Sequence, residues 1–361
     1  MARLIESRPS VARCTALAPA LLVTTLTLAC GGKIDPNSQE MPDPYKAECA
    51  GSATPPDELQ CTGLYANLAK KVLAKGVRAY APAISLWADT AEKDRWIMLP
   101  KGKVIDATDP NEWVFPVGTK LWKEFRRDGR RFETRLWQKA QSNYWVRTTY
   151  RWNTDESAAT TSKSVDIALE DGGTYHIPSG DECDQCHRGR SEKILGFEQP
   201  LLGLSGSTGL TLKQLVAEKL ISPAPTLTDL RIGDDGTGAA IAPLGWLHAN
   251  CGVSCHNGNS NSTGYGASQR LRLDPTLLDG RPSNDFESLT STVNVMSDTP
   301  AWAGQARIVP GQPDQSLMVQ LISHRGTDNP EHNQMPPIAT LMVDQADTQS
   351  VVDWIAKMPG R

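Results

Sequence analysis

The sequence predicts an α+β protein, in which an antiparallel, β-rich segment precedes a mainly α-helical segment. Three observations lead to this prediction. Apolar and polar residues alternate along 131–136 and 144–152, as they do on the strands of a sheet. Seven of the ten tryptophans lie in 87–152. After residue 180 the chain instead carries leucine-rich pieces that begin with helix-starting residues.

The first thirty residues have the pattern of an export signal. Arginines precede a mostly apolar stretch, 17–29, which is too short to span a bilayer comfortably. The run that ends in Cys30 resembles the lipobox of bacterial lipoproteins, with Thr27 where leucine is usual. We therefore expect an exported chain, lipid-anchored through Cys30 to the periplasmic face of a membrane, and Gly31 favours the outer membrane. The alternative is ordinary cleavage near the same place.

Residues 31–80 are expected to form a flexible tether and one short helix. Pro, Asp, Gly and Ser are frequent up to residue 60. From Leu64 to Lys75 the apolar residues recur at helical spacing, and Gly76 would end this helix as its C-cap.

The β-rich segment is expected at 81–180. Asp128 and Gly129 form a hairpin signal just before the alternating run at 131–136. At 144–152 aromatic and apolar side chains share one face, while Arg147 and Arg151 fall on the other. We expect the aromatic face to pack in a core and the charged face to be solvated. The alternative is that the tryptophans form a platform for carbohydrate.

The segment after residue 180 is expected to be mainly helical but interrupted. Helix starts stand at 211–216 and 316–322, and residues 347–357 have the pattern of an amphipathic terminal helix. Between them, 257–310 is rich in Gly, Asn, Ser, Asp and Pro, which predicts a long irregular insertion.

Cys183, Cys186 and His187 form a C-x-x-C-H run, the pattern for covalent attachment of c-type haem. On a helical turn, positions three apart share a face, so both sulfurs can reach the two vinyl groups on one porphyrin edge. The histidine that follows can then direct a ring nitrogen at the iron as its proximal ligand. The alternatives are a zinc site and a redox-active dithiol.

Cys251, Cys255 and His256 form a second, imperfect copy with three residues between the cysteines. The extra residue must bulge out of the turn, and Gly252 would make this easier because glycine tolerates unusual backbone angles. We expect a second haem here. The alternatives are a disulfide between Cys251 and Cys255, and a haem held by one thioether.

Met335 is the expected distal ligand of the second haem, because it begins a rigid Met-Pro-Pro loop 79 residues after His256. The first haem has no such partner close downstream. Its candidate distal ligands are His176, His248, Met98 and Met296. Its iron could also be five-coordinate, and His248 could bind a propionate instead.

Cys49 and Cys61 are the cysteines that remain once export and haem attachment have been assigned. An oxidising compartment would let them form a disulfide, although both could also stay reduced.

With these motifs in place, the chain resembles bacterial secreted diheme c-type cytochromes in which a β-rich front segment precedes two haem regions. The resemblance covers residues 90–361 and rests on "FPVGTKLWKEFRRDGRRFETRLW", "YRWN", "IPSGDECDQCH", "ILGFEQPLLGL", "WLHANCGVSCHNG", "RIVPGQPDQSLMVQLI", "MPP" and "VVDWIAKMP". It implies a first haem region at 181–242 and a second, cytochrome c-like domain at 243–361. It also implies iron ligation by His187 and His256, with Met335 distal to the second haem. The three-residue spacing between Cys251 and Cys255 departs from the usual two.

The function expected from these features is electron transfer by an exported diheme cytochrome, with a redox protein as its partner. One alternative is a haem enzyme of peroxidase or oxidase type, with one open iron site. The other is a cell-surface binding module built on the tryptophan-rich sheet. The net charge of −4 and the lack of a basic run argue against nucleic-acid binding.

Overall fold

The computed structural model describes residues 49, 54–169, 173–326 and 334–360. Residues 43–361 group into one compact unit, and its described part is α+β, as expected. The export signal, Cys30 and most of the tether lie outside the described residues. No helix within those ranges is long and apolar enough to cross a membrane.

A seven-stranded antiparallel sheet forms the β-rich part of the unit. Its strand order is β12-β3-β4-β6-β7-β8-β9, so a short strand from the segment after residue 180 closes one edge. The bounds are β3 Arg78–Ala81, β4 Glu92–Met98, β6 Lys120–Arg127, β7 Arg130–Gln141, β8 Tyr144–Trp152, β9 Ala159–Thr161 and β12 Thr208–Gly209.

The expected hairpin joins β6 to β7. Asp128 and Gly129 both have positive φ, 51° and 76°, which is the backbone of the tight turn that matches the twist of paired strands. Smaller two-stranded ladders surround the main sheet, with bounds β1 Tyr65–Asn67, β2 Val72–Leu73, β5 Ile105–Asp106, β10 Val165–Ala168, β11 Thr174–Ile177 and β13 Ile221–Ser222.

Both faces of the main sheet are largely covered, which corrects part of the expectation of a solvated charged face: Arg151 is exposed as expected, but Arg147 is half-buried. Trp122, Leu136 and Tyr150 belong to one buried cluster. Leu121 and Trp137, the neighbours of Trp122 and Leu136 along β6 and β7, point the other way into a second cluster. Charged residues on that second face are buried with it, namely Arg95, Glu133 and Lys139. The alternation was identified correctly, but the face that carries the charges packs against the rest of the chain.

Most of the tryptophans of the sheet region are core residues, as expected. Six of the seven in 87–152 are buried: Trp96, Trp113, Trp122, Trp137, Trp145 and Trp152. An exposed aromatic platform for carbohydrate is therefore not what these side chains form.

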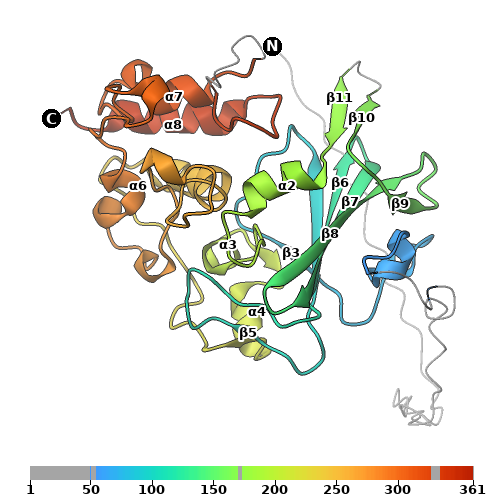
Figure 1. Ribbon diagram of the computed structural model, residues 1–361. Coiled ribbons are helices and arrows are strands. Elements are labelled where there is room, and N and C mark those ends of the chain that lie inside the picture. The colour runs from blue at the N-terminus through green and yellow to red at the C-terminus, as the bar shows by residue number, and fades with distance from the viewer. Residues whose placement is uncertain (1–48, 50–53, 170–172, 327–333, 361) are drawn as a thin grey trace, which may run out of the picture. The chain divides into compact units, whose positions relative to one another are not determined.

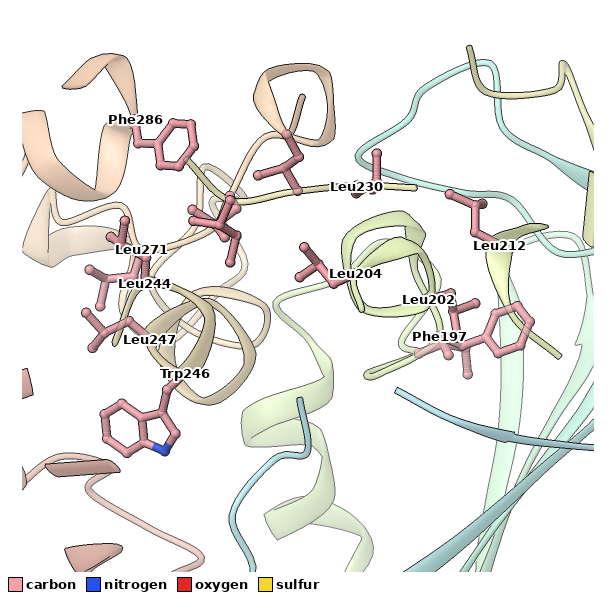
Figure 2. Close-up of a cluster of buried hydrophobic side chains, with 14 of the residues drawn as sticks. Phe197, Leu202, Leu204, Leu212, Leu230, Leu244, Trp246, Leu247, Leu271 and Phe286 are labelled. Atoms are coloured by element: carbon pink, nitrogen blue, oxygen red, sulfur yellow. The ribbon is translucent and has the colours of Figure 1, made fainter. Parts of the chain in front are cut away.

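Short helices and irregular turns make up the part after residue 178, with bounds α2 Gly180–His187, α3 Gln199–Gly203, α4 Leu212–Ala217, α5 Ile241–Leu247, α6 Glu287–Thr290, α7 Leu317–Ile322 and α8 Gln345–Lys357. The expected helices at 211–216, 316–322 and 347–357 are thus present, and 257–310 is largely irregular. Figure 2 shows how Leu244 and Leu247 of α5 lie near Leu271, in a cluster that continues to Phe197 and Leu212.

The expected helix from Leu64 to Lys75 is wrong. The segment forms the hairpin β1–β2 instead. Lys71 takes a positive φ of 53°, which a helix does not allow, and the Asn67 side chain accepts the Lys70 N–H to close the turn. Cys49 and Cys61 form a disulfide in this region.

Candidate functional site

The first cysteine motif lies on α2, whose start is fixed by a capping box between Ser179 and Glu182. Cys183 and Cys186 therefore share one side of the helix, as the spacing predicts. Arg147 on β8 holds α2 against the sheet, because its guanidinium donates to the Gly180 carbonyl at 2.9 Å and to Asp184 at 2.5 Å. Figure 1 shows α2 beside β7 and β8.

His187, the last residue of α2, is held in one orientation by two contacts. Its Nδ1 donates to the Lys193 carbonyl, and its ring stacks on Trp137 with centroids 4.3 Å apart. Burial, together with Lys123, Arg135 and other cations, lowers the pKa of His187 to about 3. The ring is therefore neutral, with its lone pair on Nε2, and a backbone carbonyl orients it as in many metal sites.

The second motif follows α5 through a π-helical turn at His248–Gly252. The amides of Val253 and His256 donate five residues back, to the carbonyls of His248 and Cys251 at 2.9 and 2.8 Å. A turn of this width holds one residue more than an α-helical turn. It therefore accommodates the third residue between Cys251 and Cys255.

Gly252 serves this turn for a different reason than expected. Its φ is not positive, so no unusual backbone angle is involved. A Cβ at this position would instead lie 2.5 Å from the backbone of Leu271 and of Arg272. Close packing against the backbone of that segment, and not backbone freedom, is what requires glycine here.

A cavity of about 100 Å³ brings Cys251, Cys255, His256 and Met335 together. The Met335 amide donates to the Leu321 carbonyl at 2.7 Å, which ties the Met-Pro-Pro loop to α7. Burial lowers the pKa of His256 to about 4, so its imidazole is neutral and available as a ligand. We call this space the second cavity. It is smaller than an ordinary cofactor pocket, so a porphyrin would displace side chains around it.

The first cavity, of about 240 Å³, is lined by Cys183, Cys186 and His187, together with apolar side chains of the sheet such as Leu121. It adjoins a cleft of about 400 Å³ beyond Cys183 and Trp137. The first and second cavities share a wall, made by Leu86, Gln185, Cys186, Ile338 and Ala339.

The two motif segments also touch directly. Thr263, which follows the second motif, donates its hydroxyl to the Gln185 carbonyl of the first at 2.8 Å. Gly189 packs so closely on the Ser254 carbonyl that a Cβ would lie 1.8 Å from the oxygen. The distance between the two cysteine motifs is thus set by backbone contact.

Gly189→Ala is expected to destabilise the protein by about 1–3 kcal/mol, because backbone must move to admit the methyl group. Urea denaturation would measure the loss. Gly258→Ala is the matched control, since a Cβ there meets nothing within 4 Å and should change stability little. Equal effects of the two substitutions would contradict the close contact.

His248, a candidate ligand of the first haem, is instead part of a buried ionic network. Its Nδ1 accepts the Leu273 amide at 3.0 Å, and its Nε2 lies 3.0 Å from a carboxylate oxygen of Glu198. Glu198 also pairs with Arg190 at 2.6 Å and with Arg272 at 3.3 Å. His248 thus lies within this network and lines neither of the two cavities. The network joins the segment after α2 to the second motif.

Glu198→Gln is expected to cost about 3–5 kcal/mol, because it leaves two buried arginines without their shared carboxylate. Although burial opposes its charge, Arg190, His248 and Arg272 hold the pKa of Glu198 well below its ordinary value. The carboxylate's contribution is therefore complete above pH 4.3 and shrinks as the pH falls below it. Free energies of unfolding measured from pH 7 to pH 3 should show that the difference in stability between wild type and Glu198→Gln becomes smaller as the pH falls.

The control for this prediction is Glu218→Gln, which removes an exposed pair with Arg78 and should cost less than about 1 kcal/mol. A loss of stability in Glu198→Gln no larger than that in Glu218→Gln would show that the buried network stabilises the protein no more than an exposed ion pair does.

The other candidate ligands of the first haem lie in unsuitable surroundings. His176 reaches the edge of the first cavity, but its ring nitrogens lie 2.6 Å from Asp166 and 3.1 Å from Glu182. The hydrogen bond to Asp166 is the main cause that raises its pKa, which favours a charged ring without a lone pair. Met98 packs with the cluster on the opposite sheet face, and Met296 is exposed.

Several residues of the site were not identified from the sequence. Trp137 stacks on His187, while Lys123 and Arg135 line the first cavity. The alternating pattern does place Arg135 and Trp137 on one face of a strand, but the charges on that face predict contact with solvent and not with a cavity. Leu86, which lies in the shared wall, carries no signal in the sequence.

The four motif cysteines, Cys183, Cys186, Cys251 and Cys255, are free thiols. Burial raises the pKa of Cys186 and of Cys251 to about 12, so these two thiols are protonated. Within the described ranges, no three His, Cys, Asp or Glu side chains gather as a metal-ion site.

Comparison with known proteins adds no further identification: no family model, no curated protein and no solved structure matches this chain.

Proposed function

We propose that this protein is an exported c-type cytochrome that binds two haems, through Cys183 and Cys186 and through Cys251 and Cys255, and passes electrons between them. The observation that carries this proposal is the wall shared by the two cavities, since Cys186 lines both. A porphyrin attached there would have one edge next to the second cavity. Haem supplies one-electron redox chemistry, and the protein supplies position, burial and ligands.

The donor set supports haem at both motifs. Each motif offers two protonated thiols and one neutral imidazole toward one cavity. Met335 lines the same cavity as His256, which suits a histidine–methionine pair.

A second candidate function is a haem enzyme with an open position at the first iron. One observation favours it, and it concerns the second axial ligand. The described lining of the first cavity holds no methionine. It holds one histidine in addition to His187, namely His176, which is bound between two carboxylates. A high-spin ferric signal from one haem, together with turnover of peroxide, would favour this function. Two low-spin haems without turnover would favour the electron carrier.

The experiment that tests the main proposal is the mass of the mature protein after export in cells that carry haem-maturation machinery. Two haems and one lipid modification are expected, and a pyridine haemochrome assay should give two haems per chain. A mass increase equal to only one haem would refute attachment at Cys251 and Cys255. A colourless protein would overturn the proposal as a whole.

Export and anchoring stay predictions from the sequence, as does a redox protein as partner. The same mass measurement tests lipid on Cys30. Fractionation of membranes from a Cys30→Ala strain would show whether the anchor depends on this residue.

A further inference from the structure

Three cationic side chains stand in a row across the middle of the sheet. Arg95 on β4 pairs directly with Lys123 on β6, and Lys123 pairs directly with Arg135 on β7. Residues paired in this way share a face and lie close together, and like charges in such pairs destabilise a sheet. The arrangement therefore needs a compensating anion.

The described residues do not supply enough negative charge to this row. Arg135 is paired with Glu133 at 2.5 Å. The guanidinium of Arg95 reaches only the Lys93 carbonyl and the Ser85 hydroxyl, at 3.3 and 3.4 Å. Lys123 has no carboxylate within ion-pair distance in this part of the chain, and its ammonium lies 5.1 Å from the centre of the Phe125 ring.

A fourth cation, Lys93, stands one position along the same face and donates to the Leu86 carbonyl. Burial and nearby Arg95 lower the pKa of Lys93 to about 7, and the same causes lower the pKa of Lys123 well below its ordinary value. Within the described residues, Glu133 is the carboxylate that pairs directly with this group of basic side chains, while Asp89 and Asp344 lie near Lys93. Keeping several basic side chains charged in such a buried setting is costly unless an anion joins them.

Two residues of the row lie in the wall of the first cavity. Lys123 and Arg135 line that cavity together with Cys183 and His187. Lys123 and Arg95 also line a narrow space that reaches Ser254 of the second motif. An anion that enters with the occupant of the first cavity would therefore meet these side chains.

We infer that Arg95, Lys123 and Arg135 form an anion site that binds the propionate groups of the first haem. This inference rests on the proposed function, since the carboxylates belong to the haem attached at Cys183 and Cys186. Two propionates would bring two negative charges to a group of basic side chains of which only Arg135 pairs with a carboxylate in the described part of the chain. The site explains why charged residues occupy the covered face of the sheet, where apolar residues are expected.

The test is a thermodynamic cycle that uses Lys123→Gln with and without the first haem. In the protein with both haems, Lys123→Gln should lower the Tm by roughly 2–4 °C, because a propionate loses its partner. In Cys183→Ala/Cys186→Ala protein, which should lack the first haem, the same substitution should raise the Tm, because repulsion is relieved. Lys101→Gln, at an exposed turn residue, should leave the Tm unchanged in both backgrounds.

The sign of the shift decides the result. A change of the same sign in both backgrounds would overturn the inference. Failure of the proposed function is seen separately, because the parent protein would then give no haemochrome before any lysine is replaced. Phosphate added to the haem-deficient protein distinguishes a general anion site, since it should raise the Tm only when Lys123 is present.

A measurement on the two-haem protein alone covers the case in which the cysteine variant fails to fold. Lys123→Gln should lower the reduction potential of the first haem, because a positive charge near the iron is lost, and Lys123→Arg should restore it. The spin state should not change in either variant. A changed spin state would overturn the inference and identify Lys123 as an iron ligand.

Discussion

Replacing Cys183 and Cys186 together with alanine should remove one haem and leave the other in place. The two sulfurs lie on one side of α2, beside the neutral imidazole of His187, and they are the pair of thiols that the described lining of the first cavity offers to a porphyrin. The thiols of Cys251 and Cys255 line the second cavity and are untouched by the change. The expected loss is half of the haem absorbance per chain.

The measurement is a pyridine haemochrome assay combined with the mass of the intact chain. Cys49→Ala/Cys61→Ala is the matched control, because it also removes two cysteines but only a disulfide. Its haem content should equal that of wild type. The reciprocal variant, Cys251→Ala/Cys255→Ala, should keep the first haem. Two haems in Cys183→Ala/Cys186→Ala protein would contradict the assignment of the first site.

The motif residues could be identified from the sequence because their chemistry is encoded locally. Cys183, Cys186 and His187 lie within one turn of helix, and the capping box that starts this helix is also local. The amphipathic terminal helix and the hairpin at Asp128 and Gly129 are local for the same reason. Such features depend on residues fewer than five positions apart.

The environment of the site could not be predicted, because it depends on which face of the sheet is covered. The alternation along β7 separates Leu136 from Arg135 and Trp137, but a period of two does not say which side meets solvent. Here both sides are covered, and the charged face borders the first cavity. The stacking of Trp137 on His187 joins residues fifty positions apart and leaves no trace in local pattern.

The irregular second motif illustrates a third limit. Three residues between Cys251 and Cys255 predict an irregular turn, but not its form. The π-helical turn follows from hydrogen bonds five residues apart and from packing of Gly252 on Leu271. Likewise, helical spacing at 64–75 failed because the Lys71 backbone and the Asn67 side chain favour a hairpin, which apolar periodicity does not report.

Replacing Met335 with alanine should lower the reduction potential of one haem by on the order of 0.1–0.3 V, within the roughly 0.8 V range that axial ligands set. Methionine opposite histidine favours ferrous iron, and Met335 lines the same cavity as His256. The weak absorption band from sulfur to ferric iron, near the red end of the spectrum, should disappear. Potentiometric titration with optical detection measures both changes.

Two further variants separate ligation from general damage to the loop. Met342→Ala removes an exposed methionine from the same surface region and should leave the spectrum and both potentials unchanged. Met335→His should keep the second iron low-spin, without the sulfur band and at a lower potential than wild type, because a second imidazole replaces the thioether. Because the Met335 amide is held by the Leu321 carbonyl, the backbone that presents residue 335 should persist in both variants of that residue. An unchanged potential and spectrum in Met335→Ala would therefore mean that another side chain ligates the second iron. The position of the second haem relative to the wall shared by the two cavities would then have to be reconsidered.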